Sequence, residues 1–168
     1  ANAGAELTIL SWITYTTILY KGENKMRSTA ILKGTENEYY RATYKSMGFS
    51  SDDMKDRPLI GIANAWSECV PGHSNLRQVA EKVKAGIYRA GGTPVEFGVM
   101  GGCDGIAQGQ IGMHYILHSR ELIASSVESM AQINLFDGLV LLGSCDKIVP
   151  GMLMAAARLD IPCILLPG

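Results

Sequence analysis

The sequence has almost no net charge and no apolar run long enough to cross a membrane. Its 15 Lys and Arg against 16 Asp and Glu leave a net charge of -1. That balance argues against a nucleic-acid-binding protein, because neutralising phosphates needs a surplus of basic residues. The uncharged run over residues 7–20 is shorter than the roughly 18–20 residues of a membrane span, and it lacks the basic start of a secretory signal. We therefore expect a cytoplasmic protein without nucleic-acid or membrane partners.

Cysteine is scarce, and its spacing does not match a closed zinc site. The four cysteines, Cys69, Cys103, Cys145 and Cys163, include no C-x-x-C pair. Two disulfides are an alternative, but Cys163 lies in the apolar run 161–166, which predicts a buried strand, and cytoplasmic thiols stay reduced. We therefore predict free cysteines, with no disulfide between Cys69 and Cys103.

The chain length and composition suit one ordinary globular domain with a short extension. Of the 168 residues, 47% are hydrophobic and 18% are charged, which excludes a disordered chain. Residues 7–20 are rich in Ile, Thr and Tyr, which favours an extended strand, and a polar stretch separates them from Met26. We interpret residues 1–25 as an extension and residues 26–168 as the domain. An added edge strand or a contact between copies is the alternative for the extension.

From residue 57 onward, strand and helix patterns alternate. Short apolar runs predict buried strands, and apolar residues three and four apart predict helices between them. Strands that are apolar on both faces indicate a parallel sheet with helices on both faces, a three-layer α/β/α fold. The expected strands are residues 58–63, 93–99, 138–143 and 161–166. The expected helices are residues 75–90 with Gly91-Gly92 as a left-handed cap, 119–133 with Ser119 as N-cap, and 150–159 with Pro150 in the first turn.

Metal-competent side chains follow the first three of these strands. The loops are residues 64–73 with Ser67, Cys69 and His73, residues 101–105 with Cys103 and Asp104, and residues 144–147 with Cys145, Asp146 and Lys147. Thiolates suit iron–sulfur clusters or zinc, whereas carboxylates suit magnesium or manganese. Because the carboxyl ends of parallel strands share one edge, we predict that Asp104, Cys145, Asp146 and Lys147 face one cleft there.

Each of these residues also has a simpler interpretation. A Cys-Asp pair at a strand end can be a buried thiol beside a turn-capping aspartate. Lys147 can be a surface ion pair with Asp146, which contributes little, or a carbamylated lysine that presents an anionic oxygen to a metal. A nucleotide-binding α/β domain is a further alternative, but the glycines after residue 97 form no clean G-x-G-x-x-G at a helix start.

Several motifs are specific enough to point to a family. They are PLIGIAN at 58–64, VPGH at 70–73, AGG at 90–92, CDG at 103–105, SRE at 119–121, FDG at 136–138 and CDKIVPGMLMAAA at 145–157. Through these motifs residues 26–168 resemble the N-terminal part of the dihydroxy-acid dehydratase and phosphogluconate dehydratase family. Its enzymes remove water from 2,3-dihydroxy or sugar acids to give 2-keto acids.

The resemblance implies two metal centres. Cys145 matches an iron–sulfur ligand, and Cys103 matches one in those members that carry cysteine there; Asp104, Asp146 and Lys147 match the Mg²⁺ site, with Lys147 carbamylated. Gly72 stands where members with a two-iron cluster carry cysteine, which favours a [4Fe-4S] cluster over the alternative [2Fe-2S] cluster. His73 and Ser67 are candidates for contact with the substrate.

The resemblance also implies what lies outside this chain. The catalytic base, a third cluster cysteine and a second, β-rich domain are expected beyond Gly168, so that residues 26–168 are a truncated N-terminal domain that can be inactive alone. The implied protein is a homodimeric hydro-lyase of branched-chain amino-acid biosynthesis, a dihydroxy-acid dehydratase. A phosphogluconate or other sugar-acid dehydratase and a non-enzymatic metal-binding α/β module are the alternatives.

Overall fold

Four parallel strands form the sheet of the computed structural model, which describes residues 26–167. The strands are β1 (Leu59–Asn64), β2 (Thr93–Gly98), β3 (Gly138–Leu142) and β4 (Cys163–Leu166), in the order β2-β1-β3-β4. β1 is buried at every position, because it lies between β2 and β3. The register pairs Leu59 with Thr93 and Ile60 with Gly138. The predicted parallel sheet is confirmed.

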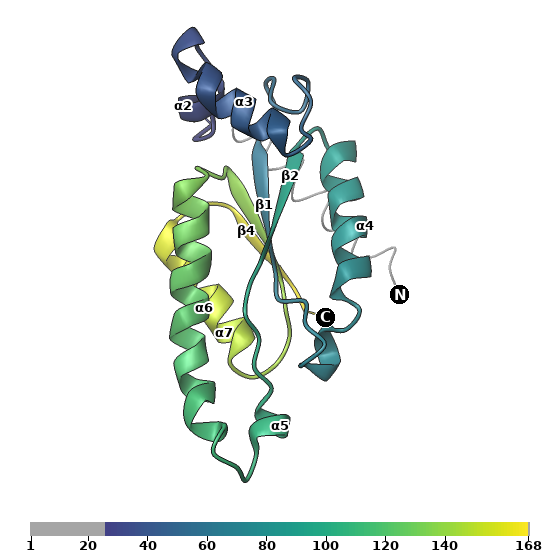
Figure 1. Ribbon diagram of the computed structural model, residues 1–168, viewed down its shortest axis with the longest axis vertical. Coiled ribbons are helices and arrows are strands. Elements are labelled where there is room, and N and C mark those ends of the chain that lie inside the picture. Colours follow the sequence, from purple (N-terminus) through teal and green to yellow (C-terminus); the bar gives the residue numbers. More distant parts are fainter. Residues whose placement is uncertain (1–25, 168) are drawn as a thin grey trace.

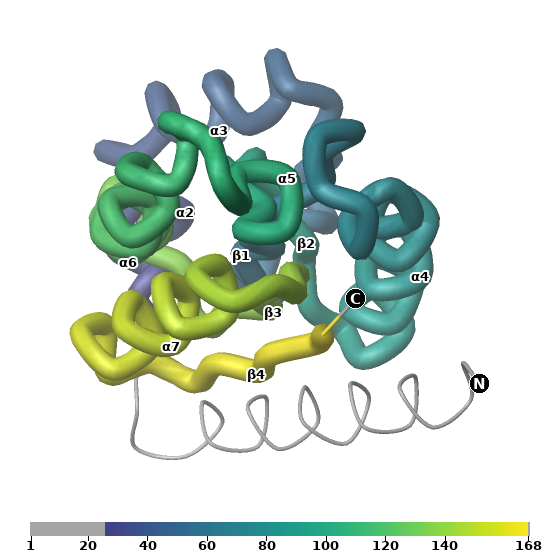
Figure 2. Tube along the Cα trace, turned by 90° about the horizontal axis from the view of Figure 1, so that it is seen from below, coloured from purple at the N-terminus to yellow at the C-terminus, as the bar shows by residue number. Residues whose placement is uncertain are grey.

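Helices cover both faces of this sheet (Figures 1 and 2). α4 (Leu76–Arg89) lies on one face, where its Val83 packs in a cluster with Ile60 and Ile62. α6 (Met113–Ile133) and α7 (Ile148–Leu159) lie on the other face, where Ile123 packs with Leu139. Successive strand residues point to opposite faces, so runs that are apolar throughout serve both helical layers. The three-layer architecture is as predicted.

The C-terminus of α4 has the expected left-handed cap. Gly91 has φ +85°, a conformation that costs glycine little. The amide of Gly91 donates to the carbonyl of Tyr88, and the amide of Gly92 donates to that of Ile87, both at 3.0 Å. These two bonds form a Schellman motif, which satisfies carbonyls that the helix itself leaves free.

The second long helix begins earlier than the sequence predicts. α6 starts at Met113, so Ser119 is not its N-cap; it lies within the helix, 4% exposed, and its hydroxyl donates to the carbonyl of Ile116 at 2.7 Å. A serine followed by an acidic residue resembled a helix start, but the same serine also fits a tightly packed helix interior. α7 starts at Ile148, which leaves Pro150 in the first turn, as expected.

Residues 26–57 contain three short helices, followed by turns, at the amino-terminal edge of the sheet; the sequence analysis did not predict these helices. They are α2 (Thr29–Leu32), the 3-10 helix η1 (Thr35–Asn37) and α3 (Glu38–Ser46), at the top of Figure 1. Asp137, at the start of β3 and fully buried, anchors this segment. It accepts bonds from the amide and hydroxyl of Ser28 at 3.1 and 2.7 Å and from the amide of Leu59 at 2.8 Å. Burial raises the pKa of Asp137, and these hydrogen bonds oppose that rise. The predicted extension, residues 1–25, lies outside the described residues.

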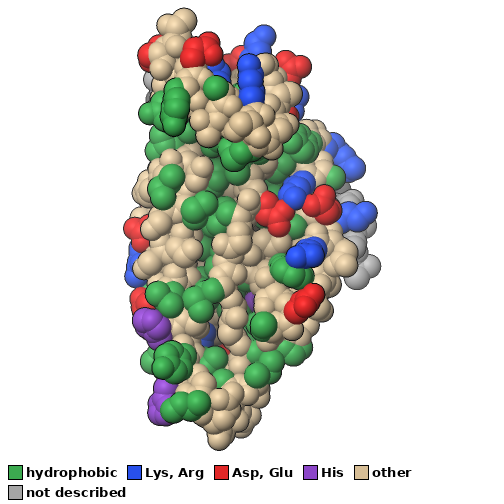
Figure 3. All heavy atoms as spheres, in the orientation of Figure 1, with side chains coloured by type: hydrophobic (Ala, Val, Ile, Leu, Met, Phe, Trp, Pro, Cys, Tyr) green, Lys and Arg blue, Asp and Glu red, His purple; other side chains and the backbone are tan. Residues whose placement is uncertain are grey.

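The two helical layers differ at the surface. Figure 3 shows hydrophobic side chains exposed along the α6 side and mixed charges over the α4 side. On α6, Tyr115, Leu117 and Ile133 are more than half exposed. On the α4 side, Lys84 makes ion pairs with Glu81 and Glu96 at 2.8 and 2.5 Å. Within residues 26–167, none of the helices combines the length and apolar character that crossing a membrane requires.

Candidate metal centre

Three loops meet at the carboxyl edge of the sheet, at the lower end of Figure 1. The loop after β1 contains the 3-10 helix η2 (Pro71–His73), the loop after β2 leads into α5 (Asp104–Ala107), and the loop after β3 leads into α7. Two backbone hydrogen bonds continue the sheet into these loops. The amide of Val99 donates to the carbonyl of Asn64 at 2.9 Å, and the amide of Ala65 donates to the carbonyl of Leu142 at 3.0 Å. The loops therefore leave the sheet side by side.

Lys147 joins two of these loops through two carboxylates. Its ammonium donates to Asp104 Oδ2 at 3.4 Å and makes a shorter contact with Asp146 Oδ2. The hydrogen bond from Lys147 lowers the pKa of Asp146, and the same bond raises the pKa of Lys147. Asp104 and Asp146, 42 positions apart in the sequence, thus share one positive charge.

Asp104 has an oxygen that no described group satisfies. Its Oδ1 is buried and has no hydrogen-bond partner, although buried polar atoms are nearly always paired because desolvation without a partner is costly. Magnesium prefers oxygen ligands of this kind. The open Asp104 oxygen beside Asp146 and Lys147 therefore fits a small divalent cation.

The cysteines of the two loops differ in backbone strain. Cys145 has φ +79°, a left-handed conformation that is rare for residues other than glycine and is concentrated at functional sites. Cys103 immediately precedes Asp104, and both Cys103 and Cys145 are half-buried. Cys103 precedes Asp104 in the sequence and Cys145 precedes Asp146, and these are the two carboxylates that Lys147 contacts. A soft thiolate centre and a hard oxygen centre can thus lie side by side.

The other two cysteines have different environments. Cys69 is exposed in the loop after β1, and burial in β4 raises the pKa of the Cys163 thiol to about 11, which disfavours the thiolate that binds metal. All four cysteines are free, so Cys69 and Cys103 are not joined by a disulfide. Across residues 26–167, no three His, Cys, Asp or Glu side chains lie close enough together to hold a metal ion. A complete metal centre therefore requires Lys147 as a ligand or donors from outside these residues.

The two candidates for substrate contact are engaged with the backbone. His73 is fully buried, and its two ring nitrogens face the carbonyl of Ala65 at 2.5 Å and the amide of Ser144 at 2.9 Å. Both ring nitrogens therefore face backbone groups, and contact of His73 with a substrate stays a prediction. The hydroxyl of Ser67 accepts a bond from the amide of Cys69 at 2.9 Å, which orders the turn in front of the cysteine.

A polar network at the end of β1 was not identified from the sequence. Asn64, 4% exposed, donates to Glu96 at 2.8 Å and accepts from the amide of Trp66 at 3.0 Å. The ring of Trp66 in turn lies 3.4 Å from the guanidinium of Arg77, a cation–π contact. The signal in the sequence was an asparagine at the end of a buried apolar strand, where a polar side chain needs partners.

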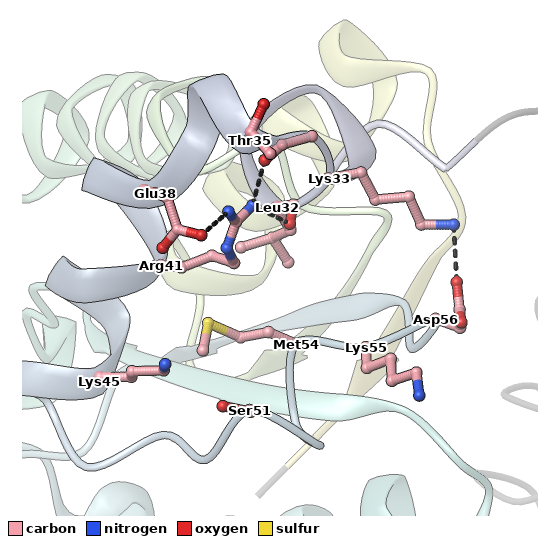
Figure 4. A pocket seen from close by; sticks show the side chains of 11 residues that line it. Leu32, Lys33, Thr35, Glu38, Arg41, Lys45, Ser51, Met54, Lys55 and Asp56 are labelled. Carbon is pink, nitrogen blue, oxygen red and sulfur yellow. Dashed lines mark hydrogen bonds and ion pairs between the residues drawn. The ribbon is translucent and has the colours of Figure 1, made fainter.

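A groove lies at the opposite edge of the sheet, and no side chain of the three loops lines it. It has a volume of about 640 Å³ and lies between α3 and residues 51–56 (Figure 4). Ion pairs between Lys33 and Asp56 and between Arg41 and Glu38, each at 2.7 Å, neutralise most of its charged groups. The chemistry of the side chains therefore locates the candidate site better than the size of the hollow does.

A family model and several known proteins are similar in sequence to this chain. The family model described as "Dihydroxy-acid/6-phosphogluconate dehydratase N-terminal" matches residues 57–168. Over 143 residues the chain is 57% identical to the dihydroxy-acid dehydratases of Pyrococcus furiosus, Acetivibrio thermocellus and Syntrophobacter fumaroxidans. These matches cover 85% of this chain and 26% of each relative, so the chain spans about a quarter of their length.

Proposed function

The chain belongs to the dihydroxy-acid/6-phosphogluconate dehydratase family, and we propose on that premise that it is the N-terminal part of a hydro-lyase. The enzyme dehydrates a 2,3-dihydroxy carboxylic acid of branched-chain amino-acid biosynthesis to a 2-keto acid. One observation carries the proposal: Asp104, Asp146 and Lys147 converge at the strand ends, with a buried Asp104 oxygen left open beside two cysteines. This donor set suits the metal-dependent removal of a hydroxyl group.

We propose that two metal groups share the edge. Asp104, Asp146 and a carbamylated Lys147 would hold Mg²⁺, and Cys103 and Cys145 would hold an iron–sulfur cluster. When bound, these groups supply Lewis acidity to the carboxylate and hydroxyl oxygens of the substrate. We favour a [4Fe-4S] cluster because Gly72 has no thiol, and a Cβ there would lie 2.8 Å from Ser144 Oγ.

Lys147, Asp104 and Asp146 determine the charge of the proposed metal site. In the form described, the ammonium of Lys147 offsets one of the two negative charges of Asp104 and Asp146. The ammonium of Lys147 first loses a proton to give the neutral amine; addition of CO₂ to that amine, with loss of a second proton from nitrogen, gives a carbamate, so the charge of the side chain changes from positive to negative. Asp104, Asp146 and the carbamate then present three anionic groups, which require a cation. His73 is engaged on both ring nitrogens, so it is not free to take the C2 proton. We therefore assign proton abstraction at C2 to the remainder of the enzyme.

The remaining properties of the proposed enzyme follow from the family. We propose that it is a cytoplasmic homodimer whose partner molecule is a small hydroxy acid. A sugar-acid dehydratase is the second candidate, because the matching family model also names 6-phosphogluconate dehydratase. The 57% identity to proteins named dihydroxy-acid dehydratase favours the branched-chain substrate.

The test uses a chimera in which this chain replaces the matching 143 residues of the Pyrococcus furiosus relative. Cys145→Ser should remove iron and its broad visible absorption, because serine oxygen is a poor substitute for thiolate. Asp146→Asn should keep the iron but lower activity roughly 100-fold or more, since the magnesium site loses an anionic oxygen. Cys69→Ser, at an exposed cysteine, is the matched control and should change neither.

Activity is measured as 2-keto acid formation from a branched-chain 2,3-dihydroxy acid and from 6-phosphogluconate. Full iron and normal turnover in Cys145→Ser would refute the assignment of the cluster ligand and the proposed function with it. A chimera that binds iron but dehydrates neither acid would favour a metal-binding module.

A further inference from the structure

We propose that His73 is a positioning residue that holds the three loops of the candidate metal centre in place. It does so by accepting a hydrogen bond from the backbone amide of Ser144, the residue before Cys145. The effect of His73 on a metal cluster rests on the proposed function, whereas its effect on the position of the loops does not.

One imidazole ring contacts all three loops. His73 belongs to the loop after β1, in which its Nδ1 lies 2.5 Å from the carbonyl of Ala65. Its Nε2 lies 2.9 Å from the amide nitrogen of Ser144 in the loop after β3. In the loop after β2, a Cβ built on Gly101 would lie 3.3 Å from Nδ1, so this backbone packs directly against the ring. The ring is fully buried, which leaves it no other role at the surface.

The hydrogen-bond geometry assigns a role to each ring nitrogen. The carbonyl of Ala65 can only accept, so Nδ1 is assigned as its donor. The amide nitrogen of Ser144 lies 2.9 Å from Nε2, nearer than the carbonyl of Ser144 at 3.1 Å, so Nε2 is assigned as the acceptor of the amide. In this assignment His73 donates within its own loop and accepts from another.

The bond to Ser144 acts on a strained backbone. Cys145 has φ +79°, and a residue other than glycine keeps such a conformation only where its surroundings determine it fully. His73 fixes the peptide immediately before this strained residue. Without that bond the backbone at Cys145 is free to relax, and Asp146 and Lys147 follow directly in the chain. His73 therefore positions both the thiol and the carboxylate cluster.

Two substitutions separate the two bonds of the ring. Glutamine places an oxygen at the level of Nε2, so His73→Gln keeps an acceptor for Ser144 and loses the bond to Ala65. Asparagine reaches only the level of Nδ1, so His73→Asn keeps a donor for Ala65 and loses the acceptor. His118→Gln, at an exposed histidine of α6, is the matched control.

The primary readout is amide hydrogen exchange at Ser144 and Cys145 in the full chain, which involves no metal. His73→Asn should speed exchange at these amides by roughly tenfold, the factor for one buried hydrogen bond, whereas His73→Gln and His118→Gln should stay near the wild type. Equal protection in the asparagine variant, or equal loss in the glutamine variant, would overturn the proposal.

A measurement on the unsubstituted chain covers the case in which the variants do not fold. Nitrogen NMR of the His73 ring at neutral pH should show an unprotonated Nε2 and a protonated Nδ1; the opposite tautomer would overturn the proposal. In the chimera, iron retention should decrease in the order wild type, His73→Gln, His73→Asn. If the exchange pattern holds but no variant binds iron, the proposed function fails while the positioning role stands.

Discussion

A single ammonium group keeps two carboxylates together at the carboxyl edge of the sheet. Lys147 lies between Asp104 and Asp146, so in the absence of a cation it serves as their counter-ion. The ammonium reduces the repulsion between the two carboxylates, although one negative charge remains and Asp104 Oδ1 has no hydrogen-bond partner. The arrangement also means that a cation entering the site competes with the ammonium, unless carbamylation removes that positive charge first.

The strain at Cys145 predicts that glycine is more stable than alanine at this position. A side chain with a Cβ costs about 1–2 kcal/mol in the left-handed region, which glycine adopts freely. Cys145→Gly should therefore be more stable than Cys145→Ala by about 1 kcal/mol in urea unfolding, since both lack the thiol and differ only in the Cβ. Equal stability of the two variants would show that the φ of +79° carries no strain.

Among the secondary-structure elements, those with a strong local pattern were predictable. The strands and α4 lie within two residues of the expected bounds, because apolar runs and a glycine cap define them locally. The start of α6 was misplaced by six residues, because Ser119 satisfies its hydroxyl on the carbonyl of Ile116 inside the helix. α2 and α3 had no strong pattern: bonds from Ser28 to the remote residue Asp137 anchor the start of α2, and the one buried side chain of α3 is Tyr44.

The cap of α4 supplies a prediction at this scale. Gly91→Ala should lower the free energy of unfolding by about 1 kcal/mol, because φ +85° is unfavourable for alanine. A Cβ at Gly91 meets no atom within 4 Å, so the loss would be conformational and not steric. Gly98→Ala is the matched control: its Cβ also meets nothing within 4 Å, and its φ is not in the left-handed region. Chemical denaturation of both variants checks this, and equal losses would contradict it.

For the molecule as a whole, Asp137 connects the amino-terminal helices to the sheet. Asp137→Asn keeps one acceptor oxygen but turns an NH₂ toward a backbone amide or the hydroxyl of Ser28. We expect it to cost about 2 kcal/mol, the penalty of a buried polar group left without a partner, and to make residues 26–57 more sensitive to limited proteolysis. Asp52→Asn, at an exposed aspartate of the same segment, is the control. Unchanged unfolding and cleavage in Asp137→Asn would contradict the anchoring role.

The candidate site was predictable in its location but not in its internal organisation. Strand order and the right-handed crossover rule bring Asp104 and Asp146 to one edge, and the ion pairs of Lys147 are compatible with that expectation. The sequence could not distinguish a histidine that contacts a substrate from one buried between loops, because both uses follow Pro-Gly in a loop. The role of His73 follows from the positions of the amide of Ser144 and the carbonyl of Ala65, and these positions depend on tertiary structure.

The central position of β1 in the sheet has a consequence for the timing of synthesis. β1 pairs with β2, in which Leu59 meets Thr93, and with β3, in which Ile60 meets Gly138. At roughly 5–20 residues per second on the ribosome, Cys69 and Cys103 emerge several seconds before Cys145 and Lys147. During that interval Cys69 and Cys103 are exposed on the nascent chain, because the carboxyl edge of the sheet is incomplete without β3. The edge that brings Cys103 and Asp104 to Cys145 and Asp146 therefore forms only after β3 has docked, and until then Cys69 and Cys103 are open to oxidation.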